Sequence, residues 1–269
     1  MSQVLIRSVW AYNLDEEFSL IHTLLQQYRF AAIDTEFPGF IYHSRRPHLL
    51  SAEEFYVLLK SNVDHLHLIQ VGLTLFDANG NLPDLGTHGA VYYAWEFNLR
   101  DFDIYSHCFA PESINFLSSN GFDFDHLRTY GIDSSLFAQR LVASHLVGSD
   151  SNIEWVTFSG AYDFGYLIKI LMGSPLPERR EDFMRLLTSF FGERLFDIKT
   201  IMRYCDGLYG GLEQVARTLN VVSTVGRPRR AGSNSVLASR TFLEMRNRFF
   251  IDRDMTMHAG APHGLNFTR

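Results

Sequence analysis

The chain has few cysteines and no long apolar runs. Among its 269 residues, the two cysteines, Cys108 and Cys205, lie in no CxxC or Cys/His pattern. This argues against a disulfide framework and against a structural zinc site. No stretch approaches the roughly 20 apolar residues that a membrane helix needs, and the N-terminus lacks the apolar segment of a signal peptide. We therefore expect a soluble intracellular protein with no membrane partner.

The chain also lacks an excess of positive charge. It has 24 Lys and Arg against 30 Asp and Glu, which gives a formal net charge of -6. A broad basic face for long nucleic acid is therefore excluded, and any nucleic-acid binding must be local. Short basic clusters occur at residues 45–46, 179–180 and 227–230. Such clusters are found in solvated loops as well as in phosphate sites.

Apolar and aromatic residues, in contrast, are abundant. Hydrophobic residues make up 46% of the chain, which contains 23 Phe and 12 Tyr. This is enough for one large core. The first helix is predicted over residues 13–29, beginning with a capping box of Asn13 and Glu16, and a second helix over residues 52–61.

Two apolar segments in the first half predict an antiparallel strand pair, residues 66–76 with residues 91–97, because the turn signal Asn79-Gly80 lies between them. The later pattern is mostly helical: helices are predicted at 111–119, 135–147, 163–173, 181–192, 211–219 and 235–250, and strands at 154–158 and 194–198. This order predicts an α/β (α+β mixed sheet) fold, with helices covering a mixed, partly antiparallel sheet. We expect residues 1–250 to form a single domain and residues 251–269 a loosely ordered C-terminal tail.

Residues 30–40, FAAIDTEFPGF, carry two carboxylates, Asp34 and Glu36, on an apolar strand pattern. Residues i and i+2 of a strand share a face, so both carboxylates point into the same space. Buried there without a partner they would repel each other, and a hard divalent cation such as Mg²⁺ or Mn²⁺ would neutralise them. The alternatives are a pair on an edge strand that faces water and a pair of helix caps.

A third carboxylate, Asp163, opens an apolar helix in the stretch WVTFSGAYDFGYLIKIL. An acidic residue in the first turn of a helix is ordinary capping chemistry. However, Asp163 follows the C-terminal end of a strand, where α/β sheets place ligands, and its aromatic neighbours Tyr162, Phe164 and Tyr166 can stack on bases. The candidate RNA contacts are Phe37, Tyr162 and Phe164.

Two further polar residues lie later in the chain. Asp197 ends a predicted strand, where capping suits it better than catalysis, and Lys199 nearby could neutralise it. A long helix is predicted from Ser233 onward, with Asn234 in its first turn.

Together these stretches resemble a known family. The segments DTEFPGF, WVTFSGAYDFGYLIKIL, FDIKTIM with GLYGGLEQVA, and AGSNSVLASRTFLEMR resemble the DEDD-type catalytic deadenylase subunit of the Ccr-Not complex. The resemblance runs from about Val9 to Phe250 and identifies a divergent member of this group, the Ccr-associated factor or Pop poly(A) ribonucleases. It implies an RNase-H-like exonuclease fold that removes poly(A) from the 3′ end of RNA and releases 5′-AMP with two divalent metal ions.

The resemblance also implies partners and site residues. The partners would be poly(A) RNA, the Ccr-Not scaffold and a second deadenylase subunit, in the nucleus and the cytoplasm. Asp34, Glu36 and Asp163 match the first three catalytic carboxylates, which bind metal. The family's general-base His and fourth carboxylate lie in a His-x-Ala-Gly-Ser-Asp-Ser motif, and here they are replaced by Arg229 and Asn234.

These replacements weaken the expected site. Asn234 can offer an oxygen to a metal but carries no charge, and Arg229 cannot accept a proton. Losing a general base typically costs about 10²- to 10⁴-fold in rate. Ser159 and His67 also depart from the family pattern, which has His and Lys there. We therefore expect a deadenylase with reduced activity, or a pseudo-nuclease that acts as a scaffold or competitor, or another DEDD exonuclease acting on DNA or structured RNA.

Overall fold

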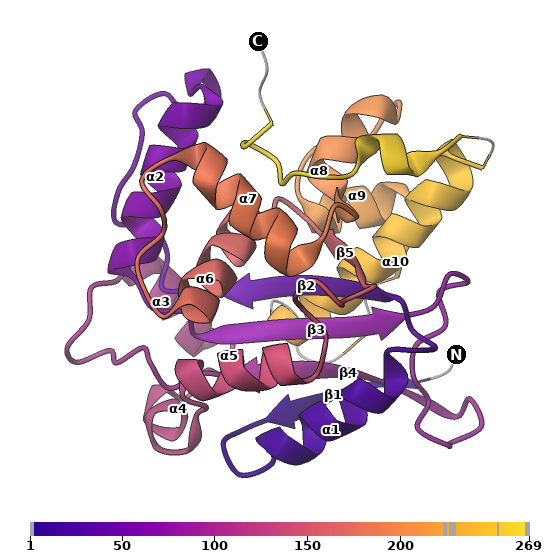
Figure 1. Ribbon diagram of the computed structural model, residues 1–269, viewed down its shortest axis with the longest axis horizontal. Helices are drawn as coiled ribbons and strands as arrows, with labels where there is room; N and C mark the ends of the chain where they lie inside the picture. The colour runs from indigo at the N-terminus through magenta and orange to yellow at the C-terminus, as the bar shows by residue number, and fades with distance from the viewer. Residues whose placement is uncertain (1–2, 223–224, 226–229, 252, 267–269) are drawn as a thin grey trace.

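A six-stranded mixed sheet forms the centre of the molecule (Figure 1). The computed structural model describes residues 3–222, 225, 230–251 and 253–266. The strand order is β1-β4-β3-β2-β5-β6, in which β3 runs antiparallel to both of its neighbours and the other pairs are parallel. The strands are β1 (Gln3–Val9), β2 (Phe30–Glu36), β3 (Gln70–Phe76), β4 (Val91–Asn98), β5 (Glu154–Thr157) and β6 (Leu195–Asp197). The predicted mixed, partly antiparallel sheet is confirmed.

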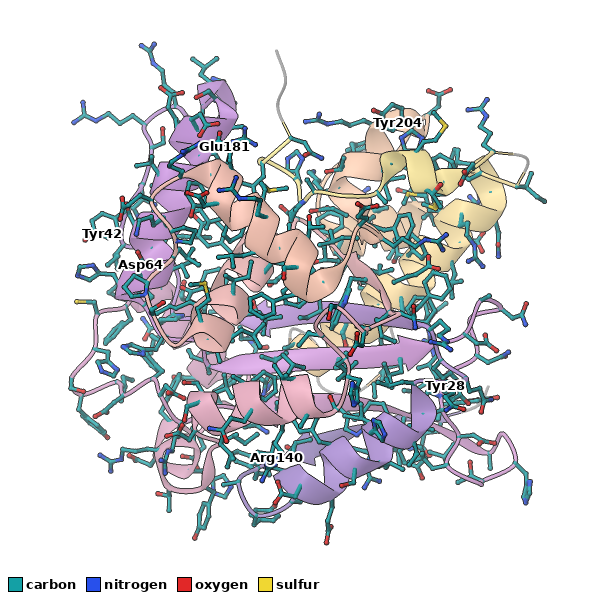
Figure 2. The ribbon with its side chains drawn as sticks, viewed as in Figure 1. Tyr28, Tyr42, Asp64, Arg140, Glu181 and Tyr204 are labelled. Atoms are coloured by element: carbon teal, nitrogen blue, oxygen red, sulfur yellow. The ribbon has the colours of Figure 1, made fainter. Side chains whose placement is uncertain are left out.

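Helices cover both faces of this sheet. The α-helices are α1 (Leu14–Leu24), α2 (Ala52–His65), α3 (Pro111–Ser119), α4 (Phe124–Tyr130), α5 (Ser134–Ala143), α6 (Ala161–Met172), α7 (Arg180–Phe191), α8 (Ile198–Ile201), α9 (Leu212–Thr218) and α10 (Ala231–Phe249). Helix α10 packs on one face against β2 and β3, whereas α1, α5 and α6 contribute to the core on the other face. Side chains fill the space between these layers, and on the outside the Arg140 guanidinium bonds the Asp15 carboxylate at 2.5 Å (Figure 2).

Several predicted boundaries differ from the structure. Helix α1 ends at Leu24 and has no capping box, because the Asn13 side chain accepts a hydrogen bond from the Trp10 backbone N–H instead (2.8 Å). The capping box occurs at α2, between Ser51 and Glu54. Strand β1 and helix α4 were not predicted. The antiparallel pairing of β3 with β4 is confirmed.

The segment after Phe250 is packed against the molecule, so the expectation of a loosely ordered tail is wrong over its described residues 253–266. The Gly260 N–H donates to the Leu195 carbonyl of β6 (2.9 Å), and the Leu265 side chain is fully buried in the core. A short 3₁₀ helix, η3 (Met255–His258), precedes these contacts. None of the described helices is long and apolar enough to cross a membrane.

Candidate functional site

Strand β2 presents Asp34 and Glu36 to the face of the sheet that α10 covers. The alternation along the strand shows this: Ala32, on the same face as Asp34, belongs to the core beneath α10, whereas Ile33 belongs to the core on the opposite face. The Asn234 amide of α10 reaches Asp34, with 3.1 Å between its Nδ2 and the Asp34 Oδ2. The spacing of the two carboxylates therefore placed them correctly on one face, and neither caps a helix.

Asp163, in the first turn of α6, is buried beside the end of β2. Its Oδ1 accepts a hydrogen bond from the Thr35 hydroxyl at 2.5 Å, and its Oδ2 accepts one from the Thr157 hydroxyl at 3.1 Å. The N-terminus of α6 has no side-chain cap, so Asp163 does not serve as one. The two threonines instead fix the orientation of a carboxylate that belongs to the site.

The negative charge of the three carboxylates is compensated only in part by the surrounding protein. Burial raises the pKa of Asp34 well above its usual range, and the charges of Asp163 and Glu36 raise it further. Burial, and then the charge of Asp163, likewise raise the pKa of Glu36, while the Arg230 guanidinium opposes this shift. Burial also raises the pKa of Asp163 in spite of its two threonine hydrogen bonds. A group of carboxylates held in this state favours binding of a cation.

Helix α10 reaches this site because its first turn touches the sheet directly. A Cβ atom at Gly72 of β3 would lie 1.9 Å from the Ala231 carbonyl oxygen, so only glycine allows this approach. Gly72 pairs with Asp34 across the β2–β3 ladder, which places the start of α10 over the carboxylates. The glycine within the apolar run LIQVGLTLF is the sequence signal for such a close backbone contact.

Arg230, immediately before α10, supplies a positive charge near Glu36. Its guanidinium lies 3.6 Å from the centre of the Phe122 ring, and its Nη2 donates to the Gly121 carbonyl at 2.5 Å. The side chain is almost completely buried. Arg229, which the resemblance described above matched to a general-base position, lies outside the described residues.

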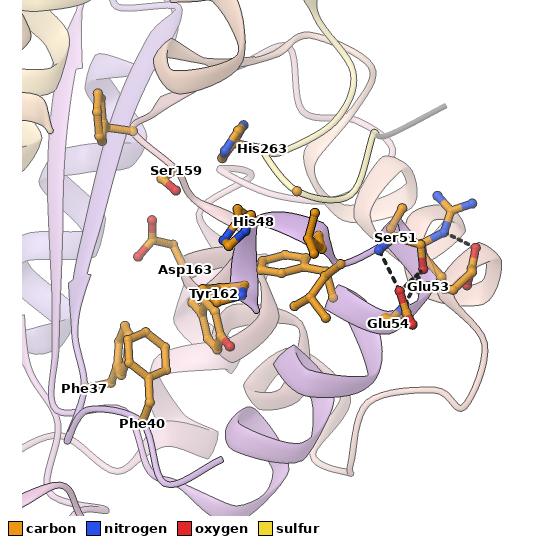
Figure 3. Close-up of a pocket in the computed structure, with 18 of the residues that line it drawn as sticks. Phe37, Phe40, His48, Ser51, Glu53, Glu54, Ser159, Tyr162, Asp163 and His263 are labelled. Carbon is orange, nitrogen blue, oxygen red and sulfur yellow. Dashed lines mark hydrogen bonds and ion pairs between the residues drawn. The ribbon is translucent and has the colours of Figure 1, made fainter. Parts of the chain in front are cut away.

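A cavity of about 1280 Å³ opens beside Asp34 and Asp163 (Figure 3). Its aromatic wall includes two of the candidate RNA contacts, Phe37 and Tyr162, whose rings stack with centroids 5.7 Å apart. Phe40 meets Tyr162 edge-on at 4.8 Å. These rings give the cavity an apolar wall next to the carboxylates.

The prediction of Phe164 as a third RNA contact is wrong. Its side chain is fully buried and packs against the rings of Trp155 and Phe191, with centroids 6.3 Å and 4.8 Å away. One residue along a helix turns the side chain by about 100°, so Asp163 and Phe164 cannot both face the cavity. Aromatic composition alone does not distinguish these two faces of α6.

The cavity has further lining residues that sequence reasoning missed. They come from the 3₁₀ helix η1 (Pro47–Leu49), from the start of α2, from α7 and from the C-terminal segment. The polar ones are His48, Ser51, Glu53, Glu54, Arg180 and His263. Ser159, in the turn before α6, also lines the cavity and adopts a left-handed backbone conformation (φ 61°). Little in the local sequence connects these distant segments.

Asp197 has a structural role, as capping chemistry suggested. Its fully buried carboxylate accepts four backbone hydrogen bonds at 2.7–3.1 Å. The donors are the N–H groups of Ser159, Gly160, Lys199 and His263. The Lys199 ammonium does not neutralise it, since it donates to the Gly210 carbonyl (2.6 Å).

The side chains of the site offer oxygen atoms, the kind of ligand that a hard cation prefers. Asp34, Glu36 and Asp163 offer carboxylate oxygens, and Asn234 has an amide oxygen. Nevertheless, the described part of the chain contains no group of three or more His, Cys, Asp or Glu side chains arranged to hold a metal ion. In this arrangement the Asn234 amide nitrogen donates a hydrogen bond to Asp34. This hydrogen bond offsets part of the carboxylate charge that a bound cation would neutralise.

Comparisons with known sequences give consistent relatives. Residues 9–134 match the CAF1 family ribonuclease model. The probable CCR4-associated factor 1 homolog 7 of Arabidopsis thaliana is 42% identical over 260 residues, covering 97% of this chain and 93% of the relative. The poly(A) ribonuclease pop2 of Schizosaccharomyces pombe is 37% identical over 245 residues, covering 91% of this chain and 70% of the relative.

Comparisons with solved structures agree on the fold. The structure of S. pombe Pop2p in its Mg²⁺- and Mn²⁺-bound form matches with a TM-score of 0.87 and 35% identity, covering 97% of this chain and 99% of that one. A yeast CAF1 chain co-crystallized with the NOT1 MIF4G domain matches with a TM-score of 0.78 and 30% identity, with 96% of each chain covered. The expected exonuclease fold is confirmed.

Proposed function

We propose that this chain, which belongs to the CAF1 family of ribonucleases, is a 3′-to-5′ exoribonuclease that removes poly(A) within a Ccr-Not complex and releases 5′-AMP at a reduced rate. The observation that carries this proposal is the convergence of Asp34, Glu36 and Asp163 on one buried site, where the protein compensates their charge only in part. That site opens into an aromatic-lined cavity.

The carboxylates would hold divalent cations, Mg²⁺ or Mn²⁺. A bound cation polarises a phosphate ester and lowers the pKa of water. Thr35 and Thr157 keep Asp163 oriented for this task. Asn234 would turn its amide oxygen to the cation only after giving up its hydrogen bond to Asp34.

The aromatic wall would bind the RNA. Phe37 and Tyr162 line the cavity next to the carboxylates, and stacking of an aromatic ring on a base is worth about 1–3 kcal/mol. Every base has a face that can stack, so this wall does not select adenine. The poly(A) assignment rests on the relatives, among them the poly(A) ribonuclease pop2 of S. pombe.

The proposed reduced rate follows from two residues at the start of α10. Asn234 replaces a carboxylate and donates a hydrogen bond to Asp34, and Arg230 places a positive charge near Glu36. Both lower the attraction of the site for a cation. Removing one ligand charge at about 4 Å is worth on the order of a few kcal/mol at an effective dielectric constant near 20.

The same substitutions favour a second candidate function, a pseudo-nuclease that occupies the complex without turnover. The likeness to a yeast CAF1 chain co-crystallized with the NOT1 MIF4G domain supports a scaffold-binding role. In either role the partners would be the Ccr-Not scaffold and a second deadenylase subunit, in the nucleus and the cytoplasm.

A metal-titrated deadenylation assay tests these functions. Oligo(A) is incubated with the purified protein and increasing Mn²⁺, and release of AMP is measured beside oligo(U) and single-stranded DNA. We expect slow release from oligo(A) that Asp34→Ala abolishes. In the double variant Arg229→His with Asn234→Asp, the rate should rise about 10²- to 10⁴-fold, because a general base and a ligand charge are both restored.

Each outcome decides between the functions. A wild-type rate equal to that of Asp34→Ala, with large recovery in the double variant, identifies a pseudo-nuclease. Isothermal titration of Mn²⁺ into wild-type protein and into Asn234→Asp measures affinity without turnover, and tighter binding is expected for the variant. Equal cleavage of DNA would refute the poly(A) assignment.

A further inference from the structure

The C-terminal segment forms one wall of the cavity. His263 and Gly264 line it together with Ser159 and Asp163, although they lie about a hundred residues further along the chain. Figure 3 shows His263 at the end of the cavity where Ser159 and Asp163 also lie. The cavity that would take the RNA is therefore incomplete without this segment.

The backbone around His263 is held at several points. Its N–H donates to the Asp197 Oδ2 at 2.7 Å, and the same carboxylate accepts the N–H groups of Ser159 and Gly160. Two residues later, the Leu265 carbonyl accepts a hydrogen bond from the Arg180 Nη1 at 3.0 Å. Asp197 thus ties His263 to the turn that leads into Asp163, and the imidazole is placed by a fixed backbone.

The described lining of the cavity offers little positive charge to hold a sugar–phosphate chain, so binding there depends on neutral hydrogen-bond donors. Its described lining residues carry four carboxylates, Asp34, Asp163, Glu53 and Glu54, and one guanidinium, Arg180. That guanidinium is already bonded to the Glu53 carboxylate (Nε to Oε1, 2.5 Å) and to the Leu265 carbonyl. A nucleic-acid backbone needs hydrogen-bond donors in such surroundings, and an imidazole provides one in either protonation state.

We propose that His263 is a substrate-binding residue, whose imidazole hydrogen-bonds the ribose–phosphate backbone of the RNA in this cavity. The inference rests on the proposed nuclease function and adds the C-terminal segment to the nuclease site. Burial of the ring lowers its pKa, so near neutral pH it acts as a neutral donor and acceptor. The His263 side chain makes this contact, while its N–H maintains the fold.

Binding of fluorescein-labelled oligo(A), measured by fluorescence anisotropy in EDTA to prevent cleavage, tests this role. We expect His263→Ala to weaken binding about three- to tenfold, the value of one lost hydrogen bond, and His263→Gln to retain part of it. The matched control is His258→Ala in the same segment, because His258 stacks on Tyr204 and does not line the cavity. It should bind like the wild type.

A second measurement uses the wild-type protein. The imidazole proton resonances of His263, assigned by their loss in His263→Ala, should shift when oligo(A) is added, whereas those of His258 should not. Unchanged His263 resonances at saturating oligo(A), or wild-type affinity in a folded His263→Ala, would overturn the inference and leave the nuclease function standing. Failure of the wild type to bind oligo(A) in EDTA would also overturn the inference, whereas the nuclease function is decided separately by the deadenylation assay in Mn²⁺.

Discussion

Two strands that lie on either side of β5 in the sheet, β2 and β6, carry carboxylates with opposite surroundings. Asp197 of β6 accepts four backbone N–H groups, so its charge is held by the fold. Asp34 of β2 faces two other carboxylates and receives one amide hydrogen bond. Burial alone therefore does not identify a functional carboxylate. The distinguishing feature is how many hydrogen-bond donors the fold supplies, many for a structural carboxylate and few for one in the site.

The largest effect is expected from removing each carboxylate in turn. Asp197→Ala leaves four buried N–H groups without an acceptor and should lower the free energy of unfolding by more than about 3 kcal/mol. Asp34→Asn removes a repulsive charge and should leave this free energy unchanged or raise it. Urea unfolding in EDTA measures both variants. Equal losses of free energy of unfolding in the two variants would show that the fold depends on both carboxylates alike.

A smaller effect is expected from pH. Burial and neighbouring charge raise the pKa of Asp34 and Glu36 in the folded protein, whereas in the unfolded chain such groups titrate near about pH 4. Above about pH 4 the unfolded chain therefore binds fewer protons, and the free energy of unfolding falls as pH rises, until the folded-state pKa values are passed.

This pH dependence is measured in EDTA by urea unfolding at about pH 5 and about pH 7. Each proton that the folded protein retains contributes up to about 1.4 kcal/mol per pH unit. The matched variant Asp34→Asn should show a flatter profile. A wild-type stability that increases over this range would contradict the incomplete compensation of this charge.

The smallest effect is expected at Lys199, which sequence reasoning offered as the partner of Asp197. Its ammonium bonds the Gly210 carbonyl, and its backbone N–H makes the contact with Asp197. Lys199→Met keeps that N–H and should change the free energy of unfolding by less than about 0.5 kcal/mol. A loss comparable to that of Asp197→Ala would show that the ammonium does compensate the carboxylate.

The parts of the site that depend on local periodicity were predictable. The spacing of Asp34 and Glu36 determined their common face, since a strand alternates at every residue. Asp163 was indicated by its place after a strand and was assigned to the site by the family resemblance, which alone singled out Asn234. The antiparallel pairing of β3 with β4 followed from two apolar runs separated by a turn signal.

The parts that depend on distant contacts were not predictable. Strand β1 pairs with β4, which is far away along the chain, and its own sequence gave little signal. His263 reaches the cavity through bonds to β6 and α7 that no local pattern encodes. The prediction that Phe164 contacts RNA was wrong for another reason. Its aromatic ring suggested stacking on a base, whereas its position on α6 directs the ring into the core.

The close contact between Gly72 and Ala231 has a consequence for residue 234. It fixes the distance between β3 and the first turn of α10, and so the distance from residue 234 to Asp34. Asparagine and aspartate have nearly the same shape, so an aspartate could occupy this position without any backbone adjustment. The charge of the site at residue 234 can therefore change while the scaffold keeps its geometry.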